Sequence, residues 1–176
     1  MKMEKLRLMQ PDESCLEEAA AYKEAMLAAG SSMDGTGSLF RMEAADWLAN
    51  CRALLDESTC PEGWVPAIQY VCVRESDGRI VGMIDLRLKF NAFLQEYGGN
   101  IGYSVRPDER RKGYAGWMLA QVLKKAREQG MQRVLVTCDS DNTASRRTIE
   151  KNGGVFDRET VYPEENLLLR RYWIET

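Results

Sequence analysis

Twelve residues, Val105-Arg-Pro-Asp-Glu-Arg-Arg-Lys-Gly-Tyr-Ala-Gly116, join a short alternating stretch at 100–105 to a helical stretch that follows. Apolar residues recur at 118, 119, 122, 123 and 126, which is the spacing of a helix with one face on a sheet. The amino end of such a helix leaves backbone N–H groups unpaired and carries partial positive charge, so it attracts phosphate. Gly113 and Gly116 let the main chain approach a ligand without an intervening Cβ. The segment therefore predicts a strand, an anion-binding loop and a helix, although the loop is neither GxGxxG nor GxxxxGK[ST].

On both sides of this loop, segments in which apolar and polar residues alternate, as in strands, are interspersed with segments whose apolar residues have helical spacing. The tetrapeptide Glu75-Ser-Asp-Gly78 is a hairpin signal between two alternating stretches. We expect a single domain over residues 1–176 of class α/β (α+β), with a central mixed, mostly antiparallel sheet of about seven strands flanked by about four helices. The expected strands are 3–9, 67–74, 79–89, 100–105, 132–138, 153–156 and 167–174, and the expected helices are 16–27, 42–56, 113–129 and 142–152.

The spacing of residues in the first two of these helices indicates one face for each. In helix 16–27 the residues on this spacing are Leu16, Ala19, Ala20, Lys23 and Leu27. In helix 42–56 they are Ala45, Leu48, Ala49, Arg52 and Leu55.

The composition excludes several kinds of catalysis. The chain has 176 residues and no histidine, which rules out Ser-His-Asp and Cys-His mechanisms and His-ligated zinc. Its five cysteines show no CxxC spacing, and an odd number indicates free thiols in a reducing compartment. Proton transfer must therefore rest on carboxylates, Tyr, Cys, Lys or water, and we expect a cytoplasmic protein with no bound metal.

The charge is distributed unevenly. Residues 100–151 carry a net +5 and the rest of the chain carries −8, within a formal total of −3. One third of the chain is thus suited to an anion, whereas a pI near 5.2 is unfavourable for nucleic acid. No apolar stretch approaches the length of a membrane span. A compact polyphosphate ligand fits this pattern best, and we expect neither nucleic acid nor a membrane as a partner.

Two motifs together resemble a known family. Arg110-x-x-Gly113-x-Ala115, preceded by Val105-x-Pro107, resembles motif A of the GNAT superfamily of acetyl-coenzyme A-dependent N-acetyltransferases. Downstream, Asn142-Thr-Ala-Ser145 and Ile149-Glu-Lys-Asn-Gly-Gly154 resemble the family's Asn-x-x-Ser and Glu-Lys-x-Gly-Phe elements. The likeness is strongest over residues 78–156.

The resemblance implies acetyl-CoA as co-substrate and assigns residues to it. Backbone amides of 111–116 would hold the pyrophosphate, and the main chain of 103–105 would pair with the pantetheine arm like an added strand. Asn142 would hydrogen-bond the pantetheine, although Asn is also a good helix N-cap. The residues implied in cofactor binding are Tyr103, Ser104, Val105, Arg110, Arg111, Lys112, Gly113, Tyr114, Ala115, Gly116, Asn142 and Ser145.

The implied reaction is direct attack of an amine on a thioester, which needs an oxyanion donor and a proton for the thiolate. The Val105 N–H is a candidate for the first requirement. For the second, Ile149 stands where the family commonly has a tyrosine, so the acid is unassigned; Tyr103, Tyr114 and Tyr162 are substitutes, as is water. An acyl-enzyme on Cys138 is disfavoured because no histidine lowers its pKa.

Three residues of the preceding strand and linker are candidates for the acceptor pocket. Asp85 lies on the face opposite its apolar neighbours and either binds or deprotonates a cationic amine, or is a solvated carboxylate. Arg87 and Asn91 follow it. We therefore take Tyr103 and Asp85 as candidate catalytic residues, and Asp85, Arg87 and Asn91 as candidate substrate-binding residues.

The leading hypothesis is an acyltransferase that moves an acetyl group from acetyl-CoA to a primary amine of a small cationic acceptor in a ternary complex. Two alternatives stay open. One is a CoA-binding sensor or regulatory module without turnover. The other is an acetyltransferase for protein amino termini or lysines. A homodimer is also left open.

Overall fold

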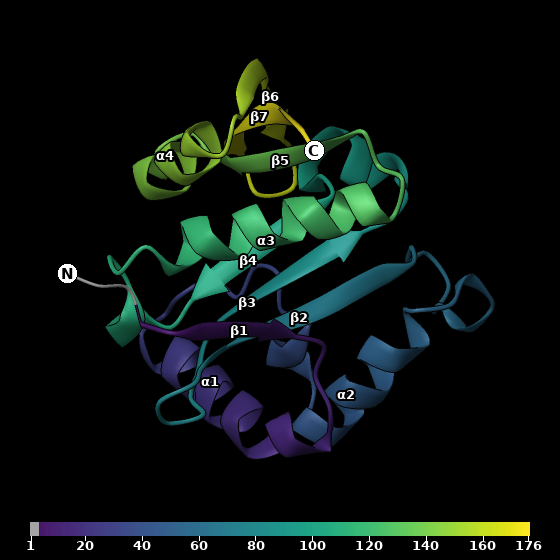
Figure 1. Ribbon diagram of the computed structural model, residues 1–176. Coiled ribbons are helices and arrows are strands. Elements are labelled where there is room, and N and C mark those ends of the chain that lie inside the picture. The colour runs from purple at the N-terminus through teal and green to yellow at the C-terminus, as the bar shows by residue number, and fades with distance from the viewer. Residues whose placement is uncertain (1–3) are drawn as a thin grey trace.

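The computed structural model describes residues 4–176, and its elements follow the expected order (Figure 1). Residue 3, where the first predicted strand begins, lies outside the described residues. The strands are β1 (Leu6–Met9), β2 (Ala67–Arg74), β3 (Ile80–Arg87), β4 (Ile101–Val105), β5 (Arg133–Asp139), β6 (Val155–Tyr162) and β7 (Leu167–Glu175). The α-helices are α1 (Leu16–Ala28), α2 (Ala44–Ala53), α3 (Tyr114–Glu128) and α4 (Thr143–Lys151).

The predicted α/β class is confirmed, but the strands divide into two sheets. One sheet has the order β1-β2-β3-β4 and the other β5-β7-β6, and every neighbouring pair is antiparallel. The sheets meet at Asn100, whose N–H donates to the Leu135 carbonyl at 2.7 Å, while its Oδ1 accepts from the Leu135 N–H at 2.8 Å. Because a side-chain oxygen replaces the main-chain acceptor there, the ladder does not continue, and β4 and β5 part beyond this residue.

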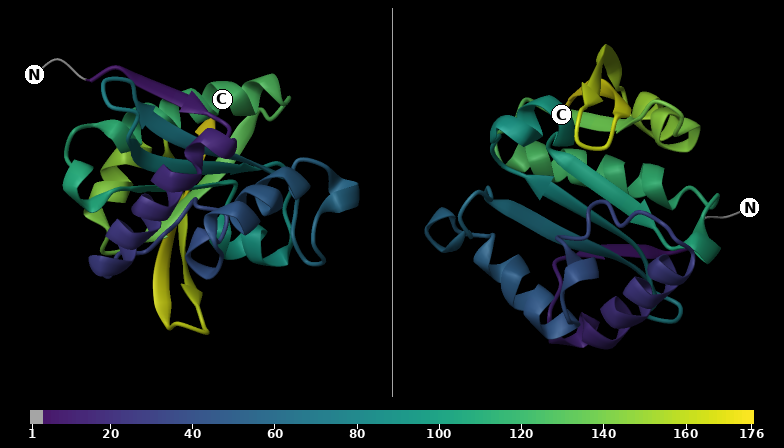
Figure 2. Two further views of the ribbon diagram at one scale, coloured as in Figure 1. Left: turned by 90° about the horizontal axis from the view of Figure 1, so that it is seen from below. Right: turned by 180° about the vertical axis from the view of Figure 1, so that it is seen from behind.

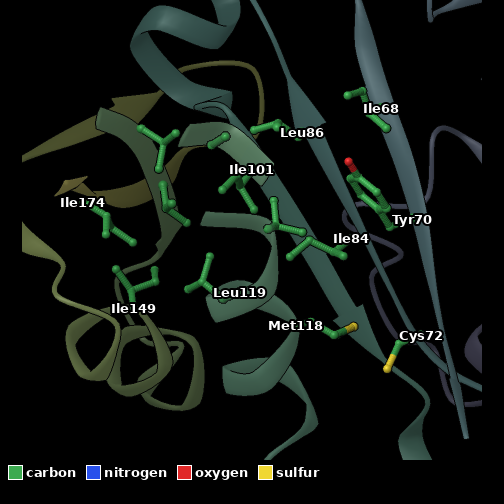
Figure 3. Packing of buried hydrophobic residues seen from close by; sticks show 14 of the residues in the cluster. Ile68, Tyr70, Cys72, Ile84, Leu86, Ile101, Met118, Leu119, Ile149 and Ile174 are labelled. Atoms are coloured by element: carbon green, nitrogen blue, oxygen red, sulfur yellow. The ribbon is translucent and has the colours of Figure 1, made fainter. Parts of the chain in front are cut away.

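Helix α3 lies between the two sheets and carries the main core. Its Met118, Leu119, Val122 and Ala126 are fully buried, as their spacing predicts. Figure 3 shows Met118 and Leu119 near Ile84 of β3. Burial of each large apolar side chain contributes about 1.5–3 kcal/mol. This packing fixes where the amino end of α3 sits against β4.

Helices α1 and α2 cover the other face of the first sheet (Figures 1 and 2). The predicted faces of these helices are partly wrong. In α1 the buried residues are Ala19, Tyr22 and Met26, whereas Leu27 is 53% exposed. In α2 they are Trp47, Leu48 and Cys51. Both helices are rich in alanine and offer two apolar faces, and the face with the larger side chains buries more area.

Within residues 4–176, no helix combines the length and the apolar character needed to cross a lipid bilayer.

Candidate active site

A cleft of about 1160 Å³ opens where the two sheets part. Its walls are β4, the ends of β5 and α4, the amino end of α3, the loop 31–38 and the β6–β7 turn. The anion-binding loop and the predicted acceptor residues therefore share one continuous space.

Alternate main-chain groups of β4 point into this cleft. The β3–β4 ladder is antiparallel, and the Arg106 N–H donates to the Val81 carbonyl of β3 at 2.9 Å. Because paired and unpaired residues alternate along such a ladder, the amide groups of Tyr103 and Val105 face the opposite edge, toward β5. The main-chain N–H and C=O of Ser104 face β3, and its side-chain hydroxyl lies 3.0 Å from the Tyr22 hydroxyl of α1. The main chain of Tyr103 and Val105 is thus placed to pair with an extended ligand.

The loop before α3 has the backbone form of an anion site. Gly113 is the N-cap at φ +84°, with no side chain capping the helix, and Arg111 has φ +65°. The amino end of α3 therefore keeps its N–H groups available. The Arg110 Nε donates to the Val105 carbonyl at 3.1 Å.

A buried carboxylate anchors the same loop. Glu109 is 2% exposed and contacts Arg74 at 2.9 Å, Arg79 at 2.6 Å and Lys112 at 2.6 Å. Lys112 thus pairs with Glu109 and does not line the cleft, whereas the other predicted cofactor residues do. Those positions remain predictions for cofactor binding.

A pair of hydroxyl groups bridges β4 and α4 across the cleft. The Tyr103 hydroxyl lies 2.7 Å from Ser145 Oγ, and burial raises the pKa of Tyr103, so the phenol stays protonated. Asn142 caps α4, because its Oδ1 accepts from the Ser145 N–H at 3.0 Å. Ile149 is fully buried in the main core and does not line the cleft.

The three residues predicted to bind the acceptor line the cleft, and each also forms hydrogen bonds within the protein. Asp85 Oδ1 accepts from the Gly102 N–H at 3.0 Å and lies 3.3 Å from Arg87 Nη2. Arg87 also donates to the Gly98 carbonyl at 2.9 Å. Asn91 donates to the Gly63 carbonyl and accepts from the Leu94 N–H, so it fixes two loops.

The structure adds three carboxylates that sequence reasoning missed. Asp34 of loop 31–38, Asp139 at the end of β5 and Glu165 of the β6–β7 turn all line the cleft. Burial raises the pKa of Asp139, and the negative charges of Asp34, Asp141 and Glu165 raise it further. No motif or spacing connects these residues, so only the fold brings them together.

Two further features bear on the chemistry of the cleft. Phe93, Tyr97 and Tyr162 pack with ring centroids 5.0–5.8 Å apart and form an aromatic wall, in which Phe93 and Tyr162 meet edge to face and the other two pairs are tilted. Burial raises the pKa of Cys138 to about 11, so its thiolate is scarce at neutral pH. In the described part of the chain, no group of three His, Cys, Asp or Glu residues is arranged to hold a metal.

Comparisons with known proteins place this fold and cleft among the acyltransferases. The family model of the acetyltransferase (GNAT) domain matches residues 5–155, and the chain therefore belongs to the GNAT acetyltransferase family. This confirms the resemblance drawn from motif A. The family uses acetyl-CoA. No curated protein matches the chain.

Solved structures share the fold at low sequence identity. Ribosomal-protein-S5-alanine acetyltransferase from Vibrio fischeri aligns with a TM-score of 0.76 at 14% identity, covering 99% of this chain and 95% of its own. A chimera of the spermidine N-acetyltransferase from Vibrio cholerae gives a TM-score of 0.67 at 13% identity, covering 97% of this chain and 95% of its own. A Salmonella typhimurium protein assigned as an acetyltransferase, solved with acetyl-CoA, gives 0.64 at 18%, covering 97% and 93%.

Proposed function

We propose that the protein transfers the acetyl group of acetyl-CoA to a primary amine of a small cationic acceptor, by direct attack in a ternary complex. The observation that carries the acceptor class is the set of carboxylates Asp34, Asp139 and Glu165 in the cleft that also receives the amino end of α3. The charges of Asp34 and Glu165 act on Asp139, so this part of the cleft attracts a cation and repels an acidic acceptor, whereas the basic lining residues Arg110 and Arg111 belong to the cofactor loop.

The cofactor would lie along the main chain of β4. The free amides of residues 111–116 and the guanidinium of Arg111 suit the pyrophosphate. The outward-facing main chain of Tyr103 suits an amide group of the pantetheine arm. This orientation brings the thioester into the space where β4 and β5 part, beside Asp139 and the Tyr103–Ser145 pair.

The chain's own groups account for each proton. The neutral amine attacks the thioester carbonyl carbon, and the Val105 N–H is the proposed donor to the oxyanion. As the C–S bond breaks, the departing thiolate takes a proton from the Tyr103–Ser145 pair. The nitrogen loses its extra proton to Asp139, because a raised pKa makes this carboxylate a stronger base than an ordinary aspartate. Asp139 then releases this proton to solvent and the Tyr103–Ser145 pair takes one from solvent, so that both return to their starting state. In this scheme Asp85 binds the acceptor and is not the base, because its Oδ1 already accepts a hydrogen bond from the Gly102 N–H.

The test follows thiol release from acetyl-CoA with paired cationic and neutral amines. We expect Asp139→Asn to lower kcat/KM for cationic amines by about tenfold or more. Asp46→Asn is the matched control, because Asp46 is exposed on α2, does not line the cleft and does not act on the pKa of Asp139. Its kcat/KM should stay within about twofold of the wild type.

The pH profile provides an independent check. Activity requires the charged carboxylate, so kcat/KM should fall as pH decreases through the raised pKa of Asp139, and this limb should vanish in Asp139→Asn. Tight binding of acetyl-CoA with no thiol release for any amine would contradict the proposal and favour a CoA-binding module.

A further inference from the structure

The floor of the cleft contains a buried oxygen that has no hydrogen-bond donor. Gln69 of β2 is 5% exposed, and its Nε2 donates to the carbonyls of Gly35, Tyr70 and Ile84 at 2.8, 3.0 and 3.2 Å. These three acceptors fix the orientation of the amide, because exchanging its oxygen and nitrogen would lose all three bonds. Its Oε1 receives no hydrogen bond from residues 4–176. Buried acceptors of this kind are rare and indicate an absent partner.

A carboxylate lies beside this oxygen. In the sheet register Gln69 pairs with Asp85, and Asp85 pairs with Gly102, so both side chains stand on the same face of the sheet. Asp85 is 7% exposed, and its Oδ1 is engaged by Gly102 and Arg87. Its second oxygen, Oδ2, accepts no hydrogen bond from the described chain. The floor therefore presents two neighbouring acceptors.

Glycines bring the main chain of loop 31–38 directly over these acceptors. Gly37 has φ +60°, and a Cβ there would lie only 3.0 Å from Gln69 Oε1. Gly35, at φ +69°, packs so closely on β4 that a Cβ would strike the Gly102 carbonyl oxygen. Loop 31–38 thus approaches the sheet without a side chain that fills the space. Gly37, Gln69 and Asp85 all line the cleft.

The position of Gln69 separates it from the reacting amine. Gln69 is on β2, two strands away from β4, and neighbouring strands lie about 4.8 Å apart, so Gln69 lies roughly 10 Å from β4, with Asp85 on the strand between them. The acetyl group would lie at the edge of β4 that faces β5, near Asp139. A group that is hydrogen-bonded to Gln69 Oε1 is therefore not the amine that attacks the thioester.

We propose that Gln69 and Asp85 bind a second cationic group of the acceptor, an amino or guanidino group, while the reacting amine lies near Asp139. One N–H of this group donates to Gln69 Oε1 and another to Asp85 Oδ2. The acceptor is then an elongated dication. This inference rests on the proposed function and specifies its substrate class.

The experiment compares acceptors of equal length that differ at the far end. For chains of three to six carbons, kcat/KM is measured for the alkylamine, the amino alcohol, the diamine and the aminoalkylguanidine. We expect the wild type to favour the dications by about 10- to 100-fold, which is the effect on affinity of a hydrogen bond to a charged group. Asp85→Asn should remove most of this preference, because Asn keeps an oxygen for the Gly102 N–H but carries no charge.

A second variant tests the contact between loop 31–38 and Gln69. Gly37→Ala places a methyl group against Gln69 Oε1 and should lower kcat/KM for the dications at least about tenfold, leaving the KM for acetyl-CoA unchanged. Gly30→Ala is the matched control, since Gly30 has the same φ of +60° but nothing within 4 Å of its Cβ position. It carries the same backbone strain without the obstruction, so its activity should match the wild type.

The outcomes separate this inference from the proposed function. Equal kcat/KM for alkylamines and dications would overturn the inference while leaving acetyl transfer intact. A loss in Gly37→Ala that is equal for all four acceptors would also overturn it, because the loop would then act only on the shape of the cleft. Release of thiol with none of the amines would contradict the proposed function itself.

Discussion

Three residues bear on which group protonates the leaving thiolate: Ile149, Tyr103 and Ser145. Ile149 stands where a tyrosine is common, and the structure buries it completely in the core, so no proton donor reaches the cleft from that position. The Tyr103 and Ser145 hydroxyls, 2.7 Å apart, lie in the cleft instead. Because burial raises the pKa of Tyr103, the phenol remains a proton donor throughout the neutral range.

Removing either hydroxyl should slow the chemical step. We expect Tyr103→Phe and Ser145→Ala each to lower kcat by about 10- to 100-fold, because a thiolate leaves readily and needs less assistance than poorer leaving groups. The double variant should lose little more than either single variant, since the two hydroxyls act as one relay. Steady-state kinetics under saturating acetyl-CoA measures this. Strictly multiplicative losses would contradict a shared proton path.

At this scale the sequence indicated which residues could bind the cofactor but not their partners. Lys112 looked like part of the anion site, yet a buried Glu109 holds it. Asp34, Asp139 and Glu165 are widely separated in the chain and belong to no motif, so no local pattern could have grouped them. Gln69 lay inside an apolar strand, where only the register of β2 and β3 reveals its neighbour Asp85.

Among the elements, α3 and the loop before it determine cofactor binding. The apolar face of α3 was predictable because Met118, Leu119, Val122 and Ala126 follow one helical spacing among polar residues. The faces of α1 and α2 were not, because alanine on several sides leaves the choice to tertiary packing. The strand bounds of β2 were predicted without error at residues 67–74, since alternation and a hairpin delimit them.

A carboxylate placed in the loop should weaken pyrophosphate binding. We expect Gly113→Asp to raise the Kd for acetyl-CoA at least about tenfold, because it adds strain at φ +84° and a negative charge at the amino end of α3. Gly130→Asp is the matched control at the opposite end of this helix, where φ is +79° and the surrounding space is open. Calorimetric titration of both variants measures the effect. Equal affinities for the two would contradict the location of the pyrophosphate.

Across the whole molecule, the division into two sheets creates the site. The sequence predicted the order of elements but placed all strands in one central sheet, because it could not show that the Asn100 side chain replaces a main-chain pair. Past that residue β4 has a free edge, α3 presents its amino end, and carboxylates from three separate segments meet. The +5 segment supplies the cofactor loop and the −8 remainder supplies Asp34 and Glu165, so the uneven charge corresponds to two substrates of opposite sign.

Acetyl transfer in a ternary complex requires that both substrates occupy this cleft together and that the amine attacks acetyl-CoA directly. The most direct test is the initial-velocity pattern, in which acetyl-CoA is varied at several fixed concentrations of a diamine. We predict intersecting lines in double-reciprocal plots and no acetyl group on the protein by intact mass, because the pKa of Cys138 is raised to about 11. Parallel lines together with an acetylated protein would contradict the ternary complex.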